Sequence, residues 1–199
     1  ISHIYQTFRY LKTKDITMEV PENYILHIGS FETRKNLITL LKAFHFLNKD
    51  NLKLVLAGTQ VLNGNKKVIK KIKKYILENN LSEKVLLPGF ISEQQAKIYY
   101  KNALIYVFPS TDEGFGIPLL EALFFSIPTI CSEIQVFKEI GNNSVEFFKP
   151  GDPNSLADKL RFLINNKYAR EKLKKKGLKH IKKFNRKNFI KGFEQFILK

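Results

Sequence analysis

Several residue types and patterns are scarce in this chain, and each scarcity excludes a class of protein. The 199 residues include a single cysteine, Cys131, so no disulfide can form within the chain. One cysteine fits a reducing compartment, and we expect a cytoplasmic protein. No apolar run approaches the roughly 18–20 residues that a membrane-spanning helix needs. Residues 1–20 carry mixed polar groups, so we also expect no signal peptide.

Acidic residues and arginines are scarce as well. Asp and Glu number 18 against 34 Lys and Arg, which gives a net charge of +16, and arginine occurs only at positions 9, 34, 161, 170 and 186. Because sites that read phosphate tend to use the bidentate guanidinium, a lysine excess argues against specific nucleic-acid recognition. Much of the charge lies in 170–191, which is read either as a solvated helix face or as a peripheral contact with anionic lipid or glycolipid at the inner membrane face.

The apolar content, 44%, is enough for a core, and its pattern alternates between two periods. Short apolar runs predict strands at 24–30, 52–58, 84–89, 103–110, 128–132 and 145–148. Helical periodicity and start signals predict helices at 36–48, 66–79, 93–102 (with Ser92 as N-cap), 117–125, 152–165, 168–183 and 186–198. Alternating strands and helices predict an α/β fold, a Rossmann-like, doubly wound parallel sheet with helices on both faces.

In such a sheet, ligands bind beyond the carboxyl ends of the strands, and three segments fall there. They are GSFETRKN (29–36), PGFIS (88–92) and PSTDEGFG (109–116). In the first, Gly29 allows a tight turn, and Arg34 and Lys35 open the following helix. Because two cations oppose the helix dipole at that end, we expect an anionic group such as phosphate beside them, the alternative being side chains in solvent.

The third segment combines glycines with two acids. Gly114, Phe115 and Gly116 form a turn whose backbone N–H groups can face a phosphate at the start of the next helix. Glu113 and Glu121, eight residues apart, suit a ligand that also carries hydroxyl groups, because a carboxylate accepts hydroxyl protons. The alternatives are a capping role for Glu113 and a surface position for Glu121.

These motifs together resemble the GT-B-fold retaining glycosyltransferases of family 4, whose E-x7-E motif takes the form E-G-F-G-[IL]-P-x-L-E-A. HIGSFETRKNL (27–37), LVLAG (54–58) and the segments 85–110 and 127–160 agree in order. The resemblance covers roughly 23–165, and the R-K-N form is most similar to mannosyltransferase-type members. Ser30 and Ser126 depart from the pattern, because many members have arginine and glycine at these positions.

The resemblance implies a set of site residues and no metal or other cofactor. Arg34 and Lys35 would neutralise the diphosphate leaving group, and Glu113 would contact the transferred hexose. The nucleotide-sugar site would comprise Gly29, Ser30, Phe90, Ile91, Gly114, Phe115, Gly116 and Glu121, with Glu121 on the ribose hydroxyls and the backbone near Phe90 and Ile91 at the nucleobase.

A GT-B enzyme has two Rossmann-like domains, and this chain matches only the second. We therefore expect an interdomain linker tail at 1–22, a nucleotide-sugar-binding domain at 23–183 and a C-terminal helix at 184–199. The expected activity is transfer of a hexose from a nucleotide sugar to a glycan or lipid-linked acceptor, with retention. A fragment without the N-terminal domain, which would hold the acceptor site, should be inactive alone. The alternatives are another nucleotide-sugar enzyme and a non-catalytic basic binding module.

Overall fold

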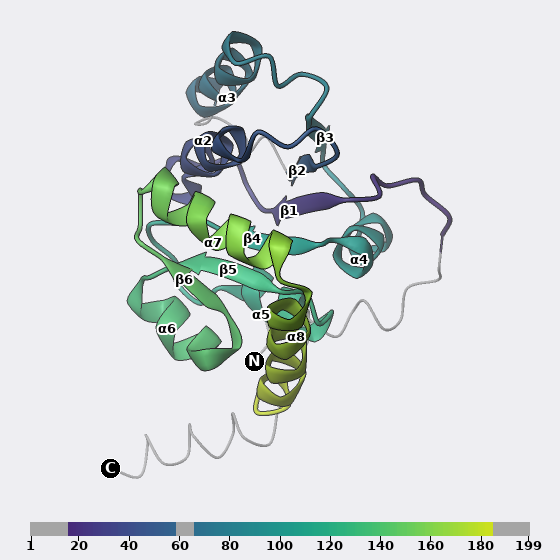
Figure 1. Ribbon diagram of the computed structural model, residues 1–199, viewed down its shortest axis with the longest axis vertical. Helices are drawn as coiled ribbons and strands as arrows, with labels where there is room; N and C mark the ends of the chain where they lie inside the picture. The colour runs from purple at the N-terminus through teal and green to yellow at the C-terminus, as the bar shows by residue number, and fades with distance from the viewer. Residues whose placement is uncertain (1–15, 59–65, 185–199) are drawn as a thin grey trace.

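The computed structural model describes residues 16–58 and 66–184, and its centre is a parallel β-sheet (Figure 1). The six strands have the order β3-β2-β1-β4-β5-β6, and every neighbouring pair is parallel. Their bounds are β1 Tyr24–Ile28, β2 Lys53–Ala57, β3 Val85–Gly89, β4 Ile105–Phe108, β5 Thr129–Ser132 and β6 Glu146–Phe148. The doubly wound parallel sheet predicted from the sequence is confirmed.

Helices cover both faces of this sheet. Their bounds are α2 Leu37–Leu47, α3 Lys66–Glu78, α4 Glu93–Asn102, α5 Ile117–Phe124, α6 Gln135–Gly141, α7 Pro153–Asn165 and α8 Lys167–Ile181, with the short 3-10 turns η2 Thr33–Lys35 and η3 Asn142–Ser144. Apolar residues of α2, α3 and α7 form the core on one face, and those of α4, α5 and α6 form the core on the other. α8 follows α7 and packs on α5.

The predicted elements are present, mostly one or two residues shorter than expected. Ser92 caps α4 through a capping box with Gln95, and the Asp152 side chain accepts from two N–H groups at the start of α7. α6 is not predicted from the sequence. The predicted helix at 186–198 lies outside the described residues, as does most of the predicted linker. Of that linker, residues 16–22 form no helix or strand, and Met18 and Val20 pack against the core.

The sheet has its topological switch point between β1 and β4. From β1 the chain proceeds outward through β2 and β3, whereas from β4 it proceeds in the opposite direction through β5 and β6. The loops that leave the carboxyl ends of β1 and β4 therefore lie at this switch point, which is where open α/β sheets bind ligands. Two of the three segments selected from the sequence, 29–36 and 109–116, are these two loops.

Candidate functional site

The carboxyl end of β1 lies so close to the end of β2 that the residue after β2, Gly58, has no room for a side chain. The Gly29 N–H donates to the Ala57 carbonyl at 3.0 Å, and a Cβ on Gly58 would lie 1.7 Å from the Gly29 carbonyl oxygen. The Gly58 N–H in turn donates to the Gly89 carbonyl at 2.8 Å, which ties in the end of β3. Three neighbouring strand ends thus form one continuous edge.

The loops after β1 and β4 are joined by backbone contacts. The Thr111 N–H donates to the Arg34 carbonyl at 2.8 Å, and Arg34 Nη1 donates to the Asp112 carbonyl at 3.3 Å. Residues some 78 positions apart in sequence are thereby held together at the switch point.

Glu113 bridges the two cations that the sequence analysis selected. Lys35 Nζ pairs with Glu113 Oε1, and Arg34 Nη1 pairs with Glu113 Oε2 at 3.0 Å. Ser110 Oγ also donates to Glu113 Oε1, at 2.9 Å. The Lys35 and Glu113 side chains are 7% and 8% exposed, so this pair is almost fully removed from water. Buried partners of this kind depend on each other, because removing one leaves a charge uncompensated.

Ser30 and Glu32 extend the cluster on its outer side. Ser30 Oγ and Arg34 Nε both donate to the Glu32 carboxylate, the latter at 2.7 Å. The hydrogen bond from Ser30, followed by the contact with Arg34, lowers the pKa of the Glu32 carboxyl. Arg34 and Lys35 lie in η2, and not at the start of α2 as the sequence suggested. The anion beside them in the structure is the Glu113 carboxylate.

His27, which the sequence analysis did not select, lies directly beneath this cluster. Its imidazole is fully buried on β1, and its Nδ1 lies 3.0 Å from the Val107 carbonyl, so Nδ1 carries the proton. Its Nε2 has no hydrogen-bond partner among the described residues and lies 3.0 Å from the position a Gly29 Cβ would take. Burial, together with the nearby Lys35 charge, lowers the pKa of His27 to about 4.

Glu121 on α5 is oriented by a buried tyrosine. Tyr100 Oη donates to Glu121 Oε2 at 2.9 Å, and the Tyr100 ring stacks on Phe125 with centroids 5.3 Å apart. The neighbouring Tyr106 Oη donates to the Ile28 carbonyl at 3.2 Å, at the end of β1. Burial, and next the Glu121 charge, raises the pKa of Tyr106. The Glu121 carboxylate is therefore a fixed acceptor and not a freely rotating surface group.

The remaining predicted residues lie around the same edge. Gly116, with φ +77°, is the N-cap of α5, and a Cβ there would come within 3.1 Å of the Phe137 ring. Gly114 and Phe115 are exposed just before it. After β3, the Phe90 side chain is 76% exposed, whereas Ile91 packs against the core.

Three supporting residues were missed by sequence reasoning. His27 is a titratable residue inside an otherwise apolar strand that is followed directly by Gly29, and this is a signal that could have identified it. Tyr100 carries no such signal, because it reaches the Glu121 carboxylate only through the packing of the fold. Ser110 lies three residues before Glu113 in the same loop, and this local spacing is a signal that could have identified it. Within 16–58 and 66–184, no group of three or more His, Cys, Asp or Glu side chains is arranged to hold a metal ion.

Comparison with known proteins identifies the family of this fold and site. A family model described as "Glycosyl transferases group 1" matches residues 12–180, which is most of the chain. The chain belongs to the group 1 glycosyltransferases. This group 1 glycosyltransferase chain is 31% identical over 155 residues to the O-antigen chain mannosyltransferase RfbU of Salmonella typhimurium. The aligned residues cover 78% of this chain and 42% of RfbU. The chain spans less than half the length of the curated relatives it matches.

Solved structures agree with the fold of the group 1 glycosyltransferase chain. The C-terminal domain of a glycosyl transferase group 1 family protein, LpcC of Francisella tularensis, superposes with a TM-score of 0.73 at 21% identity, covering 89% of this chain and 90% of that one. HepE of Anabaena, solved with UDP and glucose, superposes with a TM-score of 0.74 at 17% identity, covering 94% of this chain and 50% of that one. Likeness at these identities shows the fold alone.

Proposed function

We propose that the chain is the C-terminal, donor-binding domain of a retaining family 4 glycosyltransferase. It would bind a nucleoside-diphosphate hexose, which the complete protein transfers to a glycan or lipid-linked acceptor. The observation that carries the proposal is the switch-point cluster in which Glu113 bridges Arg34 and Lys35. The C-terminal domain of LpcC, which has nearly the same extent, supports the placement within a longer protein.

The cluster suggests how a donor would bind. In the structure the charges of Arg34 and Lys35 are balanced by Glu113 and Glu32. A diphosphate entering this edge would compete for the two cations and release the Glu113 carboxylate to accept hexose hydroxyls. Arg34 and Lys35 would then stabilise the charge that develops on the departing nucleoside diphosphate, which is the preorganised electrostatic part of catalysis.

The other predicted residues would define the two ends of the donor. Glu121, held by Tyr100, would accept the ribose hydroxyls. The amides of Gly114, Phe115 and Gly116 would face the distal phosphate and sugar, and the backbone at Phe90 and Ile91 would face the base. We propose mannose as the hexose, because RfbU is named a mannosyltransferase and the R-K-N segment resembles enzymes of that type.

Replacing the proposed ribose acceptor tests this function. We expect Glu121→Ala to weaken binding of the matching nucleoside diphosphate by about 1.5–3 kcal/mol, the range for hydrogen bonds to charged groups. The fold should survive, because Glu121 is only half-buried. Calorimetric titration with UDP, GDP and their sugars provides the measurement, with Glu78→Ala on α3 as the matched control. Unchanged affinity together with lowered stability would contradict the ribose role.

The proposal also predicts that the 199-residue chain binds the donor and transfers no sugar. An acceptor hydroxyl must be held at about 3–3.5 Å from the anomeric carbon, and we assign that role to residues of the complete protein outside this chain. A transfer assay with labelled donor compares this chain with the complete protein. Efficient transfer by the chain alone would refute the assignment of the acceptor site to the other domain.

A further inference from the structure

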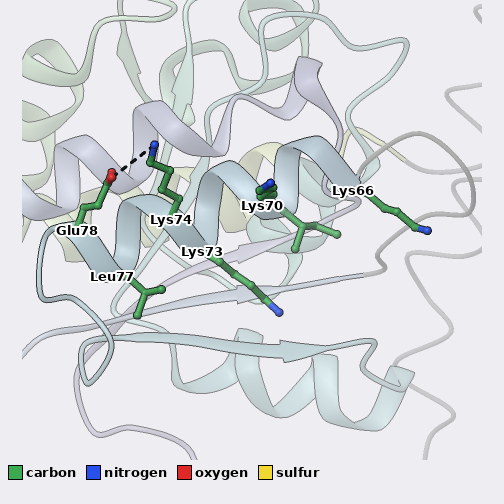
Figure 2. A pocket seen from close by; sticks show the side chains of 7 residues that line it. Lys66, Lys70, Lys73, Lys74, Leu77 and Glu78 are labelled. Atoms are coloured by element: carbon green, nitrogen blue, oxygen red, sulfur yellow. Dashed lines mark ion pairs between the residues drawn. The ribbon is translucent and has the colours of Figure 1, made fainter.

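The outer face of α3 carries more exposed lysines than any other described helix. Its exposed lysines are Lys66, Lys67, Lys70, Lys71, Lys73 and Lys74, and its one acid is Glu78. The spacing of Lys66, Lys70, Lys73 and Lys74 places these four on one side of the helix. Figure 2 shows Lys66 and Lys73 extending away from the helix and Lys74 directed toward Glu78, with which it forms an ion pair at 3.6 Å.

An exposed leucine lies in the middle of these lysines. Leu77 is 68% exposed, follows Lys66, Lys70, Lys73 and Lys74 at the same helical spacing, and lines a shallow surface hollow with them. The buried apolar residues of α3, Ile72 and Ile76, contact the core, and Val68, Ile69 and Tyr75 pack against it half-buried. Leu77 therefore gives α3 an apolar point on its charged face that the fold itself does not require.

A second helix, α8, is also basic, but it carries fewer exposed lysines than α3. On α8 the exposed lysines are Lys167, Lys172, Lys175 and Lys179, and the exposed acid Glu171 pairs with Lys174. The two helices lie at opposite ends of the molecule in Figure 1, so their lysines form two separate basic surfaces. The membrane contact considered for 170–191 therefore has a stronger candidate in α3.

We propose that the outer face of α3 adsorbs to an anionic lipid bilayer, with Leu77 entering the headgroup region. Clustered lysines are attracted to the negative surface potential of such a bilayer, and their flexible stems allow the ammonium groups to reach separate headgroups. The apolar side chain adds contact with the acyl boundary. A face made of lysine without arginine matches a surface of dispersed negative charge better than a partner that requires bidentate recognition. This proposal does not depend on the donor site.

Vesicle sedimentation tests the electrostatic part. The probe is a vesicle of phosphatidylglycerol and phosphatidylcholine in a 3:7 ratio, with phosphatidylcholine alone as the neutral reference. A quadruple variant of α3 (Lys66, Lys70, Lys73 and Lys74 to Gln) is compared with a matched variant of α8 (Lys167, Lys172, Lys175 and Lys179 to Gln). Both variants remove four exposed positive charges. Since each lysine near the surface contributes about fivefold to partitioning, the α3 variant should lose at least about tenfold. The α8 variant should lose less than about threefold.

Fluorescence tests the orientation. The chain contains no tryptophan, so Leu77→Trp introduces a single reporter on α3, and Leu178→Trp, at a half-exposed position on α8, is the matched control. On adding anionic vesicles, the emission of the Leu77→Trp variant should shift to the blue and be quenched by brominated lipid, whereas that of Leu178→Trp should not change.

Three results would overturn the proposal. They are equal losses of vesicle binding in the α3 and α8 variants, binding to neutral vesicles as strong as to anionic ones, and an unchanged Leu77→Trp spectrum in the presence of bound vesicles. Retention on a DNA duplex without binding to vesicles would likewise assign this face to a different polyanion.

Discussion

His27 is a residue whose protonation state depends strongly on its surroundings. Its imidazole is fully buried beside the aromatic rings of Tyr106 and Phe108, and it lies near the Lys35–Glu113 pair. Protonation of the imidazole would place a second positive charge beside Lys35, in a buried position where water cannot solvate it. Because the imidazole is neutral, the Glu113 carboxylate has only the charges of Arg34 and Lys35 to balance.

The lowered pKa of His27 predicts a loss of stability at mildly acidic pH. The pKa is about 4 in the fold against an ordinary value of 6.5, so between these pH values the unfolded chain binds a proton that the folded chain does not. Stability contributed by the neutral imidazole is complete above about pH 6.5 and falls as pH falls toward 4, by about 3 kcal/mol in total. Urea unfolding at several pH values gives the free energy of unfolding of the wild type and of His27→Leu. This free energy should depend less on pH in the variant, and an equal dependence in both proteins would exclude His27 as the cause.

How far the sequence predicts single residues depends on where their partners lie. Arg34 and Lys35 were selected because two cations near a helix start need an anion, and Glu113 was selected within the E-x7-E spacing. That Glu113 itself is the anion could not be predicted, because the contact spans 78 positions and depends on the register of β1 beside β4. The Tyr100–Glu121 hydrogen bond likewise depends on α4 and α5 packing on the same face.

At the scale of elements, local signals predicted those boundaries that are fixed locally. Ser92 and Asp152 cap their helices through nearby backbone N–H groups. The sequence predicted Ser92 as an N-cap, and a start signal predicted the helix that begins at Asp152. α6 was missed because Ile134, at its N-cap, makes no side-chain capping hydrogen bond and the helix has only seven residues. Elements without their own caps depend on tertiary packing, which a single sequence does not display.

Ser126 adopts a backbone conformation that favours glycine. It follows the C-cap of α5 and has a φ of +59°. The Ser126 N–H donates to the Leu123 carbonyl, and the Ile127 N–H donates to the Ala122 carbonyl. These two hydrogen bonds form a Schellman motif. A serine in this left-handed conformation is strained, because its Cβ is crowded by the backbone.

Ser126→Gly should therefore stabilise the domain. We expect a gain of about 0.5–1 kcal/mol in the free energy of unfolding, since relief of the strain exceeds the extra backbone entropy of glycine in the unfolded chain. Urea unfolding gives the measurement. Ser82→Gly is the control, because Ser82 is exposed and is not among the positive-φ residues, so it should lose stability. A loss in Ser126→Gly equal to that of the control would show that Ser126 is not strained.

At the scale of the whole molecule, the doubly wound sheet brings together what the sequence keeps apart. The loops at 29–36 and 109–116 meet because β1 and β4 are neighbours at the switch point, and α5 begins at the same edge. Within the described ranges, no helix is long and apolar enough to cross a membrane. We propose that this edge binds the diphosphate of a nucleotide sugar.

Comparing nucleoside with nucleoside diphosphate tests that claim most directly. The variant is Arg34→Ala/Lys35→Ala/Glu113→Gln, in which the glutamine prevents a buried carboxylate from being left without its cations. Lys73→Ala/Lys74→Ala removes two exposed lysines from the C-terminal half of α3, the half further along the helix from the carboxyl end of β2, and is the control. In calorimetric titrations of the folded proteins, the triple variant should bind the diphosphate at least about tenfold more weakly and the nucleoside within about threefold of wild type. The control should match wild type for both ligands. Equal losses for nucleoside and diphosphate, or undiminished diphosphate binding by the triple variant, would contradict the account.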